Sequence, residues 1–323
     1  MQTIENINEI GQLPRGLVLS IGNFDGLHRG HQTILAVAKN AAAQRQTGVA
    51  VMTFDPHPVA ILRPDKAPGM LTLLSQKKQL LQAAGVDYLI VIRDSFSLLN
   101  LSPADFVDNF LMSHLSPSVI VEGANFNFGY GRSGNVQTLR TLGADRGFEV
   151  IEVPFNEVRL GKERCGAVCS SSLIRQLLEK GTVHDAAQLL TRPYRLMGTV
   201  VAGRGIGRKL GYPTANVHSA GQIIPAEGVY AGYVVVGQSP EEVCFGGLRR
   251  PAALSIGRAK TFLADLPLLL EAHLIEESVE DLYGKWVGLE FMEWIRHQCR
   301  FPSRQALIDQ IEQDCRDALA VLI

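Results

Sequence analysis

Two different rhythms of apolar and polar positions run along the 323 residues of the chain. In the first half, short apolar runs rich in β-branched residues alternate with stretches of helical periodicity. Strands that are buried on both faces of a parallel sheet have this apolar character. The alternation predicts an α/β domain built on one open parallel sheet. The expected strands are 17–21, 49–54, 88–92, 119–122 and 148–153, and the expected helices are 31–45, 75–84, 103–112 and 135–145.

The rhythm changes near Pro193. Apolar runs then follow one another across glycine-rich connections, which predicts an antiparallel sheet or a small barrel. An amphipathic helix at 303–323 closes the chain, and Pro302 and Ser303 mark its start. We therefore expect two domains, 1–187 and 188–323. The expected strands of the second domain are 196–201, 229–236, 252–256 and 268–275.

Composition narrows the class of protein. Hydrophobic residues make up 46% and charged residues 20%, as in globular rather than disordered chains. The formal net charge of −1 gives no overall basic field for nucleic acid. Residues 1–10 do not resemble a signal peptide, and no apolar run approaches the roughly 20 residues that span a bilayer. The five scattered cysteines indicate reduced thiols. We expect a cytoplasmic protein without a membrane partner.

The motif with the most candidate functional residues directly follows the first strand. It is the sequence GNFDGLHRGH at 22–31. Glycines permit a sharp turn here, and a helix starts close to the two histidines. His28 and His31 are three apart, so they share a helix face. Imidazoles beside a helix N-terminus suit a phosphate group. The alternative is a tight turn with a purely structural histidine pair.

Three further motifs follow strands or open helices of the first half. TFDPHP at 53–58 is a loop stiffened by two prolines. GANFNFGYGR at 123–132 carries Asn125, which can orient a phosphate or ribose, and two phenylalanines that alternate. At least one of these phenylalanines belongs to the core, while the other is available to stack on a flat ring. SSSLIR at 170–175 caps a helix and offers hydroxyls and a guanidinium to an anion.

Two motifs carry the chemistry of the second half. GRGIGRKLGYPTAN at 203–216 is glycine-rich but lacks the Walker spacing. Thr214 and Asn216 point the same way in an extended chain, and their oxygens suit a Mg²⁺ that also binds ATP phosphates. In the strand at 268–275, Glu271 and His273 share one face. Glu271 is either a functional carboxylate or part of a solvated barrel face.

The sequence at 22–31 resembles the G-x-F-D-G-x-H-x-G-H signature of nucleotidylyltransferases, and more narrowly the bacterial bifunctional riboflavin kinase/FAD synthetase family. The other motifs match that family along nearly the whole chain. The resemblance implies a Rossmann-like nucleotidylyltransferase domain followed by a riboflavin kinase-like barrel with a terminal helix. It also implies ATP as co-substrate, Mg²⁺ as cofactor, and riboflavin, FMN and FAD as small-molecule partners. Protein partners stay open.

The resemblance implies the following site residues. The catalytic residues are His28, His31 and Glu271. ATP for adenylylation is held by Gly22, Phe24, Asp25, Gly26, Asn125, Ser171 and Arg175, and ATP for the kinase by Gly203, Gly207, Arg208, Gly211, Thr214 and Asn216. The flavin contacts are Phe54, Pro56, Pro58 and Phe128, and the metal ligands are Thr214 and Asn216.

The second domain departs from the family pattern at three positions. Ser255 stands where the family has Asn, Lys260 replaces a Pro, and Gln298 replaces a Glu. These departures motivate one alternative, a monofunctional FAD synthetase whose barrel only binds flavin as a sensor or docking module. A second alternative is a nucleotidyl transferase that acts on a nicotinamide or pantetheine compound, against which the Pro-Thr-Ala-Asn motif argues.

Overall fold

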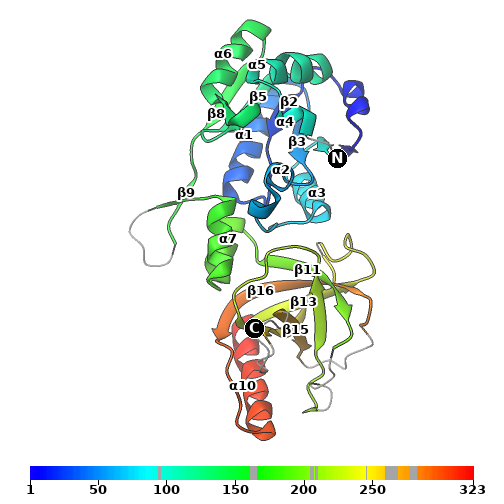
Figure 1. Ribbon diagram of the computed structural model, residues 1–323, viewed down its shortest axis with the longest axis vertical. Helices are drawn as coiled ribbons and strands as arrows, with labels where there is room; N and C mark the ends of the chain where they lie inside the picture. Colours follow the sequence, from blue (N-terminus) through cyan, green and yellow to red (C-terminus); the bar gives the residue numbers. More distant parts are fainter. Residues whose placement is uncertain are drawn as a thin grey trace. The chain divides into compact units, whose positions relative to one another are not determined.

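The computed structural model describes residues 1–93, 96–160, 166–203, 207, 210–244, 246–258, 268–275 and 282–323. The chain forms two compact units (Figure 1). The first unit contains Met1–Pro68, Lys77–Arg159 and the stretch that ends at Cys169. The second contains Gly69–Gln76 and Ser170–Ile323. The two helices before Pro193 thus belong to the barrel unit.

A six-stranded sheet forms the centre of the first unit, in the order β1-β4-β3-β2-β5-β8. Every neighbouring pair in this sheet is parallel. The predicted Rossmann-like sheet is therefore confirmed, and only the short edge strand β1 was not expected. The strands are β1 (Gln2–Ile4), β2 (Val18–Ile21), β3 (Val49–Phe54), β4 (Tyr88–Ile92), β5 (Val119–Gly123) and β8 (Glu149–Val153).

The order of strands reverses between β2 and β5. From β2 the chain adds β3 and β4 on one side and then returns to place β5 on the other side. Ligands of such sheets bind at this switch point, beyond the carboxyl ends of the strands. The two loops that leave β2 and β5 are the ones that carry the GNFDGLHRGH and GANFNFGYGR motifs.

Helices cover the sheet and connect its strands. The helix expected at 103–112 is wound as one short α-helical turn followed by a π-helix. The α-helices are α1 (Arg29–Arg45), α2 (Pro58–Leu62), α3 (Leu74–Ala83), α4 (Phe96–Leu99), α5 (Pro103–Asp105) and α6 (Val136–Arg146). The other elements are the 3₁₀ helices η1 (Ile7–Gln12), η2 (Pro64–Lys66) and η4 (Tyr130–Arg132), the π-helix η3 (Phe106–Leu115), and the short strands β6 (Asn127–Phe128), β7 (Gly134–Asn135), β9 (Glu157–Val158) and β10 (Ala167–Val168).

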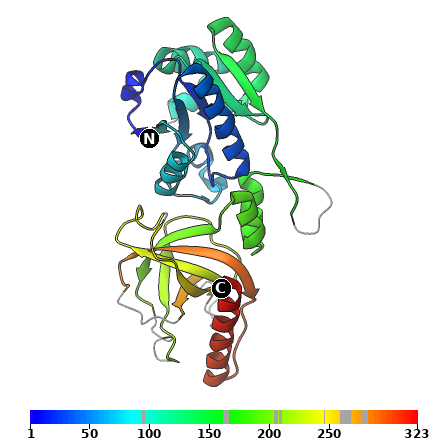
Figure 2. The same cartoon turned by 180° about the vertical axis from the view of Figure 1, so that it is seen from behind.

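The second unit is a closed antiparallel barrel in the order β11-β12-β15-β14-β13-β16. Helix α10 packs against β13, β14 and β16, and Figure 2 shows it, in dark red, alongside the barrel. The expected barrel is confirmed, although β12 and β16 were not predicted. The strands are β11 (Tyr194–Val201), β12 (Ala215–Ser219), β13 (Gly228–Gly237), β14 (Arg250–Arg258), β15 (Leu268–Leu274) and β16 (Trp286–Arg296), and the helices are α7 (Ser171–Glu179), α8 (Val183–Leu190) and α10 (Arg304–Leu322).

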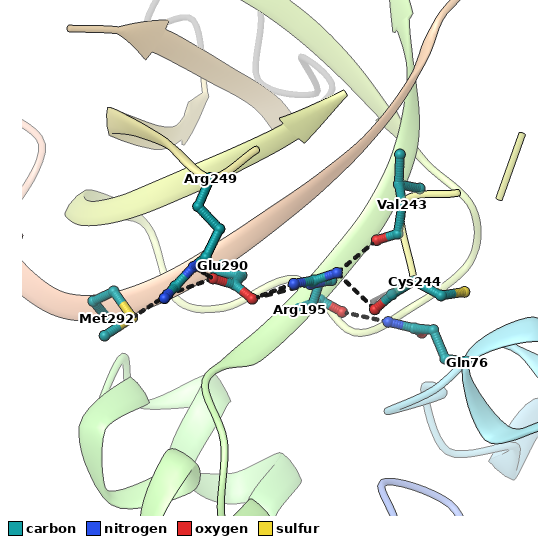
Figure 3. Close-up of polar contacts among 7 residues, drawn as sticks. All are labelled: Gln76, Arg195, Val243, Cys244, Arg249, Glu290 and Met292. Atoms are coloured by element: carbon teal, nitrogen blue, oxygen red, sulfur yellow. Dashed lines mark hydrogen bonds and ion pairs between the residues drawn. The ribbon is translucent and has the colours of Figure 1, made fainter. Parts of the chain in front are cut away.

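The segment Gly69–Gln76 is a part of the barrel unit that comes from the first half of the sequence. Gln222 donates hydrogen bonds to the carbonyls of Leu71 (2.9 Å) and Arg195 (3.0 Å). The side-chain amide of Gln76 donates to the same Arg195 carbonyl over 3.1 Å (Figure 3). Local sequence patterns do not indicate such a long-range attachment.

A buried carboxylate lies next to this attachment. Glu290 of β16 accepts hydrogen bonds from the guanidinium groups of Arg195 and Arg249 (Figure 3). Arg195 also donates to the carbonyls of Val243 (2.8 Å) and Cys244 (2.6 Å). One ion pair therefore ties a loop to two strands of the barrel. None of the described helices is long and apolar enough to cross a membrane.

Candidate active sites

The loop after β2 places both motif histidines at the start of α1. Gly26 has φ +83°, and Phe24 and Leu27 also have positive φ, so this turn is strained. His28 is the N-cap residue of α1, which begins at Arg29. The rings of His28 and His31 stack with centroids 3.7 Å apart. The predicted shared face of the two histidines is therefore confirmed.

The surroundings of the two histidines set the pKa of His31 and provide a hydrogen-bond partner for His28. Burial, followed by the nearby His28 and Lys77, lowers the pKa of His31 well below its usual range, so its imidazole is neutral. The thiol of Cys169 lies 3.6 Å from Nδ1 of His28. Burial raises the pKa of Cys169, so the thiol keeps its proton and can donate it to Nδ1.

The TFDPHP loop is hydrogen-bonded directly to the loop after β2, which carries the motif histidines. The hydroxyl of Thr53 donates to the carbonyl of Asn23 over 3.1 Å, and the Asn23 side-chain amide lies 2.9 Å from Nε2 of His57. Nδ1 of His57 accepts the backbone N–H of Val59 at 3.1 Å. Phe54 packs against the hydrophobic core, whereas Pro56 is exposed. The two motifs thus form one edge of the sheet.

The loop after β5 adds Asn125 and two phenylalanines. A Cβ at Gly123 would lie 3.2 Å from Oδ1 of Asn125, so this side chain folds back over the end of β5. Phe128 is 7% exposed and belongs to the core, where its ring stacks on Phe126 at 5.6 Å. The expectation that at least one of the two phenylalanines is core is confirmed, and the flavin contact of Phe128 stays a prediction.

Lys77 is a buried residue at this edge that the sequence analysis missed. Its side chain comes from α3 and its ammonium donates to Oγ1 of Thr53 over 3.3 Å. The carboxylates of Asp25 and Asp55 act on it electrostatically. One feature of the sequence indicates that Lys77 is buried. It lies four residues before Leu81, which is fully buried, and so shares its helix face.

Ser171 and Arg175 lie on α7 and belong to the barrel unit. Ser170 caps this helix by accepting the backbone N–H of Leu173 over 3.3 Å, as predicted. The guanidinium of Arg175 donates to the carbonyl of Gly69 over 2.7 Å. The phosphate role expected of Ser171 and Arg175 stays a prediction.

The barrel brings the kinase motif and Glu271 together. Glu271 of β15 pairs with Asn216 of β12 on one side and with Ser255 of β14 on the other. Residues directly opposite in antiparallel strands point to the same face. Along β15 the alternation is as predicted, because Leu270, Ala272 and Leu274 are buried while Glu271 is half-buried. Asn216, Glu271 and Ser255 therefore form a row across three strands.

The glycine-rich loop closes against this row. A Cβ at Gly203 would overlap the side-chain amide of Asn216, so only glycine fits there. A Cβ at Gly207 would lie 3.1 Å from Oγ1 of Thr214. Gly211 lies at the turn into Tyr212, whose hydroxyl donates to Glu312 of α10 over 2.8 Å. Arg208 and Lys260 lie outside the described residues.

His273, which shares this face of β15 with Glu271, anchors the loop. Nδ1 of His273 lies 2.9 Å from the carbonyl of Pro213, and since a carbonyl only accepts, the imidazole donates. Among the described residues, no group of three or more His, Cys, Asp or Glu side chains could hold a metal. A metal at Thr214 and Asn216 would depend on hydroxyl, amide and phosphate oxygens, which are ligands that suit Mg²⁺.

Comparisons with known proteins match both units. A family model described as FAD synthetase matches residues 11–166, and one described as riboflavin kinase matches residues 190–322. A bifunctional riboflavin kinase/FMN adenylyltransferase of Escherichia coli (strain K12) is 35% identical over 317 residues, covering 97% of this chain and 96% of that protein. The protein of the same description from Haemophilus influenzae is 34% identical over 320 residues, covering 99% of each.

The fold also matches a solved structure over its whole length. A crystal structure described as a macrolide-efflux protein from Streptococcus pneumoniae is 28% identical to this chain, with a TM-score of 0.82. The match covers 98% of this chain and 97% of that one.

Proposed function

The chain belongs to the bifunctional riboflavin kinase/FMN adenylyltransferase family, and we propose that it carries out two successive reactions. It transfers a phosphoryl group from ATP to riboflavin, giving FMN, and then transfers the adenylyl group of a second ATP to FMN, giving FAD and pyrophosphate. The observation that carries this conclusion is that FAD synthetase and riboflavin kinase matches occupy the two halves of one chain.

In the adenylylation step we propose that His28 and His31 stabilise charge at the α-phosphate of ATP. The FMN phosphate is already an anionic nucleophile, so positioning and charge stabilisation provide the catalysis. The imidazoles at the start of α1 act as hydrogen-bond donors there. The other proposed ATP contacts are Gly22, Phe24, Asp25, Gly26, Asn125, Ser171 and Arg175, and the proposed flavin contacts are Phe54, Pro56, Pro58 and Phe128.

In the kinase step we propose that Glu271 orients the riboflavin hydroxyl and accepts its proton. The alcohol is not ionised near neutral pH, so a carboxylate must take the proton, late in a loose transition state. Support comes from the cross-strand position of Glu271 beside Asn216. Bound Mg²⁺ would neutralise charge on the ATP phosphates, with Thr214 and Asn216 as its protein ligands. The proposed ATP loop contains Gly203, Gly207, Arg208 and Gly211.

We further propose that the activities divide at the boundary between 1–187 and 188–323, and that the protein is cytoplasmic. No described feature favours the alternative in which the barrel only binds flavin. The riboflavin kinase match over residues 190–322 argues against a transferase for a nicotinamide or pantetheine compound.

One experiment tests the whole proposal. The purified chain is incubated with riboflavin, ATP and Mg²⁺, and the flavins are separated by chromatography. We expect FMN to appear first and FAD afterwards. If FAD forms from supplied FMN but no FMN forms from riboflavin, the barrel is only a binding module. If neither product forms, both assignments are wrong.

A further inference from the structure

Lys77 is a buried cation that the reaction as described above does not use. It is 7% exposed and belongs to the same compact unit as His28 and His31. Groups from both motif loops surround it: the hydroxyl of Thr53 accepts its hydrogen bond, and Asp25, Asp55 and His31 interact with it electrostatically. The ammonium therefore lies at the carboxyl edge of the sheet, where proteins of this fold bind their ligands.

The hydrogen bonding of this ammonium is incomplete. An ammonium group has three N–H donors. Among residues 1–93, 96–160 and the other described parts of the chain, Thr53 is its one hydrogen-bond acceptor, and no carboxylate forms an ion pair with it. The single bond is long, at 3.3 Å. A charge removed from water with two unfilled donors is costly unless a ligand supplies acceptors.

A second buried polar atom that interacts with Lys77 belongs to His31. Nδ1 of His31 has no hydrogen-bond partner among the described residues. Desolvation lowers the pKa of Lys77, whereas Asp25 and Asp55 oppose this effect and favour the charged form. The positive charge of Lys77 thus acts electrostatically on His31, whose Nδ1 has no hydrogen-bond partner among the described residues. Oxygen-rich anions satisfy both groups at once.

We infer that Lys77 is a phosphate-binding residue of the adenylylation site, which donates its two remaining N–H groups to phosphate oxygens of a substrate. This inference rests on the proposed function, since that function brings phosphates to the carboxyl edge of the sheet. Two sources share the chemistry: the β- and γ-phosphates of ATP, which leave as pyrophosphate, and the phosphate of FMN.

The test compares Lys77→Met with a matched control at the next position. Lys78 is on the same helix, but its ammonium is bonded to Glu5 over 2.6 Å and its side chain is 33% exposed. K78M therefore removes a lysine from α3 without touching the site. Urea unfolding of each full-length variant, compared with that of the wild type, reports whether the variant is folded. K77Q serves as a second variant, since its amide can still bond to Thr53.

We expect K77M and K77Q to lower kcat/KM of FMN adenylylation by about 10² or more, as loss of a donor to a charged oxygen does in comparable sites. K78M should behave as the wild type. A rise confined to the KM for ATP, with weaker inhibition by pyrophosphate, assigns Lys77 to the ATP phosphates, whereas a rise confined to the KM for FMN assigns it to the flavin phosphate. Adenylylation and pyrophosphate inhibition within twofold of the wild type in either folded variant would overturn the inference.

Equilibrium binding separates this inference from the proposed function. Pyrophosphate with Mg²⁺ is titrated into the full-length wild type, K77M and K78M, and the heat of binding is measured. If the wild type makes no FAD yet binds pyrophosphate more tightly than K77M does, the proposed reaction is wrong and the phosphate site stands. If K77M binds pyrophosphate as tightly as K78M and its KM for FMN is also unchanged, Lys77 only balances the charge of Asp25 and Asp55.

Discussion

Gln298 donates a hydrogen bond of 2.9 Å from its side-chain amide to the hydroxyl of Ser255, which lies directly across the barrel strands from Glu271. The same amide also donates to the carbonyl of Ile256 over 3.1 Å. Ser255 and Gln298 are two of the three positions at which the barrel departs from the family motifs. Because the serine oxygen accepts this bond, the serine proton is free for donation on the barrel face that Ser255 shares with Glu271. The two departures thus form a matched pair.

This pairing predicts the effect of Gln298→Glu. A carboxylate at 298 would accept the serine proton and would add a negative charge near Glu271, which raises the pKa of Glu271. The acid limb of the pH profile of FMN formation should therefore move to higher pH, because Glu271 must be ionised to accept a proton. The measurement is kcat/KM for riboflavin between pH 5 and 9. Equal profiles for Q298E and the wild type would show that the pair does not influence Glu271.

Much of the architecture was predictable because it depends on local patterns. Buried parallel strands are continuous apolar runs, so 49–54 and 88–92 coincide with β3 and β4. The strand β16 was missed, since its polar positions include Glu290, whose charge is neutralised by arginines distant in sequence. The attachment of Gly69–Gln76 to the barrel unit was missed for the same reason, because it depends on side chains more than a hundred residues away.

Some features of the candidate sites also follow from local sequence patterns, and others depend on the fold. The spacing of His28 and His31 was enough to predict their common face, and alternation was enough for Glu271 and His273. The cross-strand neighbours of Glu271 depend on barrel register, which a single strand does not encode. The place of Lys77 depends on where α3 meets two loops from other strands. Local spacing therefore finds the residues of a motif, and only the fold finds their partners.

Removal of either motif histidine should slow adenylylation selectively. In the proposed mechanism, His28→Ala and His31→Ala each delete one donor to charge that develops at the α-phosphate, and such a loss costs about 10² to 10³ in kcat. The kinase chemistry takes place in the barrel, so riboflavin phosphorylation should stay near its wild-type rate. Both rates are measured on the same sample by flavin chromatography. If both reactions slow equally, the stacked pair is structural.

Glu122 predicts a pH dependence of stability. Burial raises the pKa of this carboxyl well above its usual range, although the backbone N–H of Ile21, which donates to it over 2.6 Å, acts in the opposite direction. The folded chain therefore holds a proton at Glu122 that the unfolded chain releases. Its contribution to stability is fully present below the unfolded pKa and is lost as pH rises toward the folded pKa.

Glu122→Gln isolates this effect. The amide oxygen still accepts the Ile21 N–H, but the side chain no longer titrates. As pH rises from 5 to 8, the free energy of unfolding of the wild type should fall relative to that of E122Q, and urea unfolding at several pH values measures the difference. Parallel pH dependences of the two proteins would mean that Glu122 is ionised in the folded state.

The two ion pairs that Glu290 forms in Figure 3 predict unequal effects of removing their members. The side chains of Glu290 and Arg195 are 9% and 12% exposed, whereas that of Arg249 is 45% exposed. Glu290→Ala leaves the buried Arg195 guanidinium without its carboxylate, which should cost about 3–5 kcal/mol of unfolding free energy. Arg249→Ala removes a solvated partner and should cost about 0–1 kcal/mol. Urea unfolding of the full chain tests both values, and equal costs would contradict the difference in burial.

Glu271→Gln is the decisive test of the kinase assignment. Glutamine keeps the shape of the side chain and its place between Asn216 and Ser255, but it cannot accept the hydroxyl proton of riboflavin. ATP binding should therefore survive, while FMN formation should fall by the factor of about 10² to 10⁴ that loss of a general base causes. FAD formation from supplied FMN should stay unchanged, because that step belongs to the first domain and needs no such base. If Glu271 only faces water on the outside of the barrel, E271Q will phosphorylate riboflavin at the wild-type rate, and another group must accept the proton.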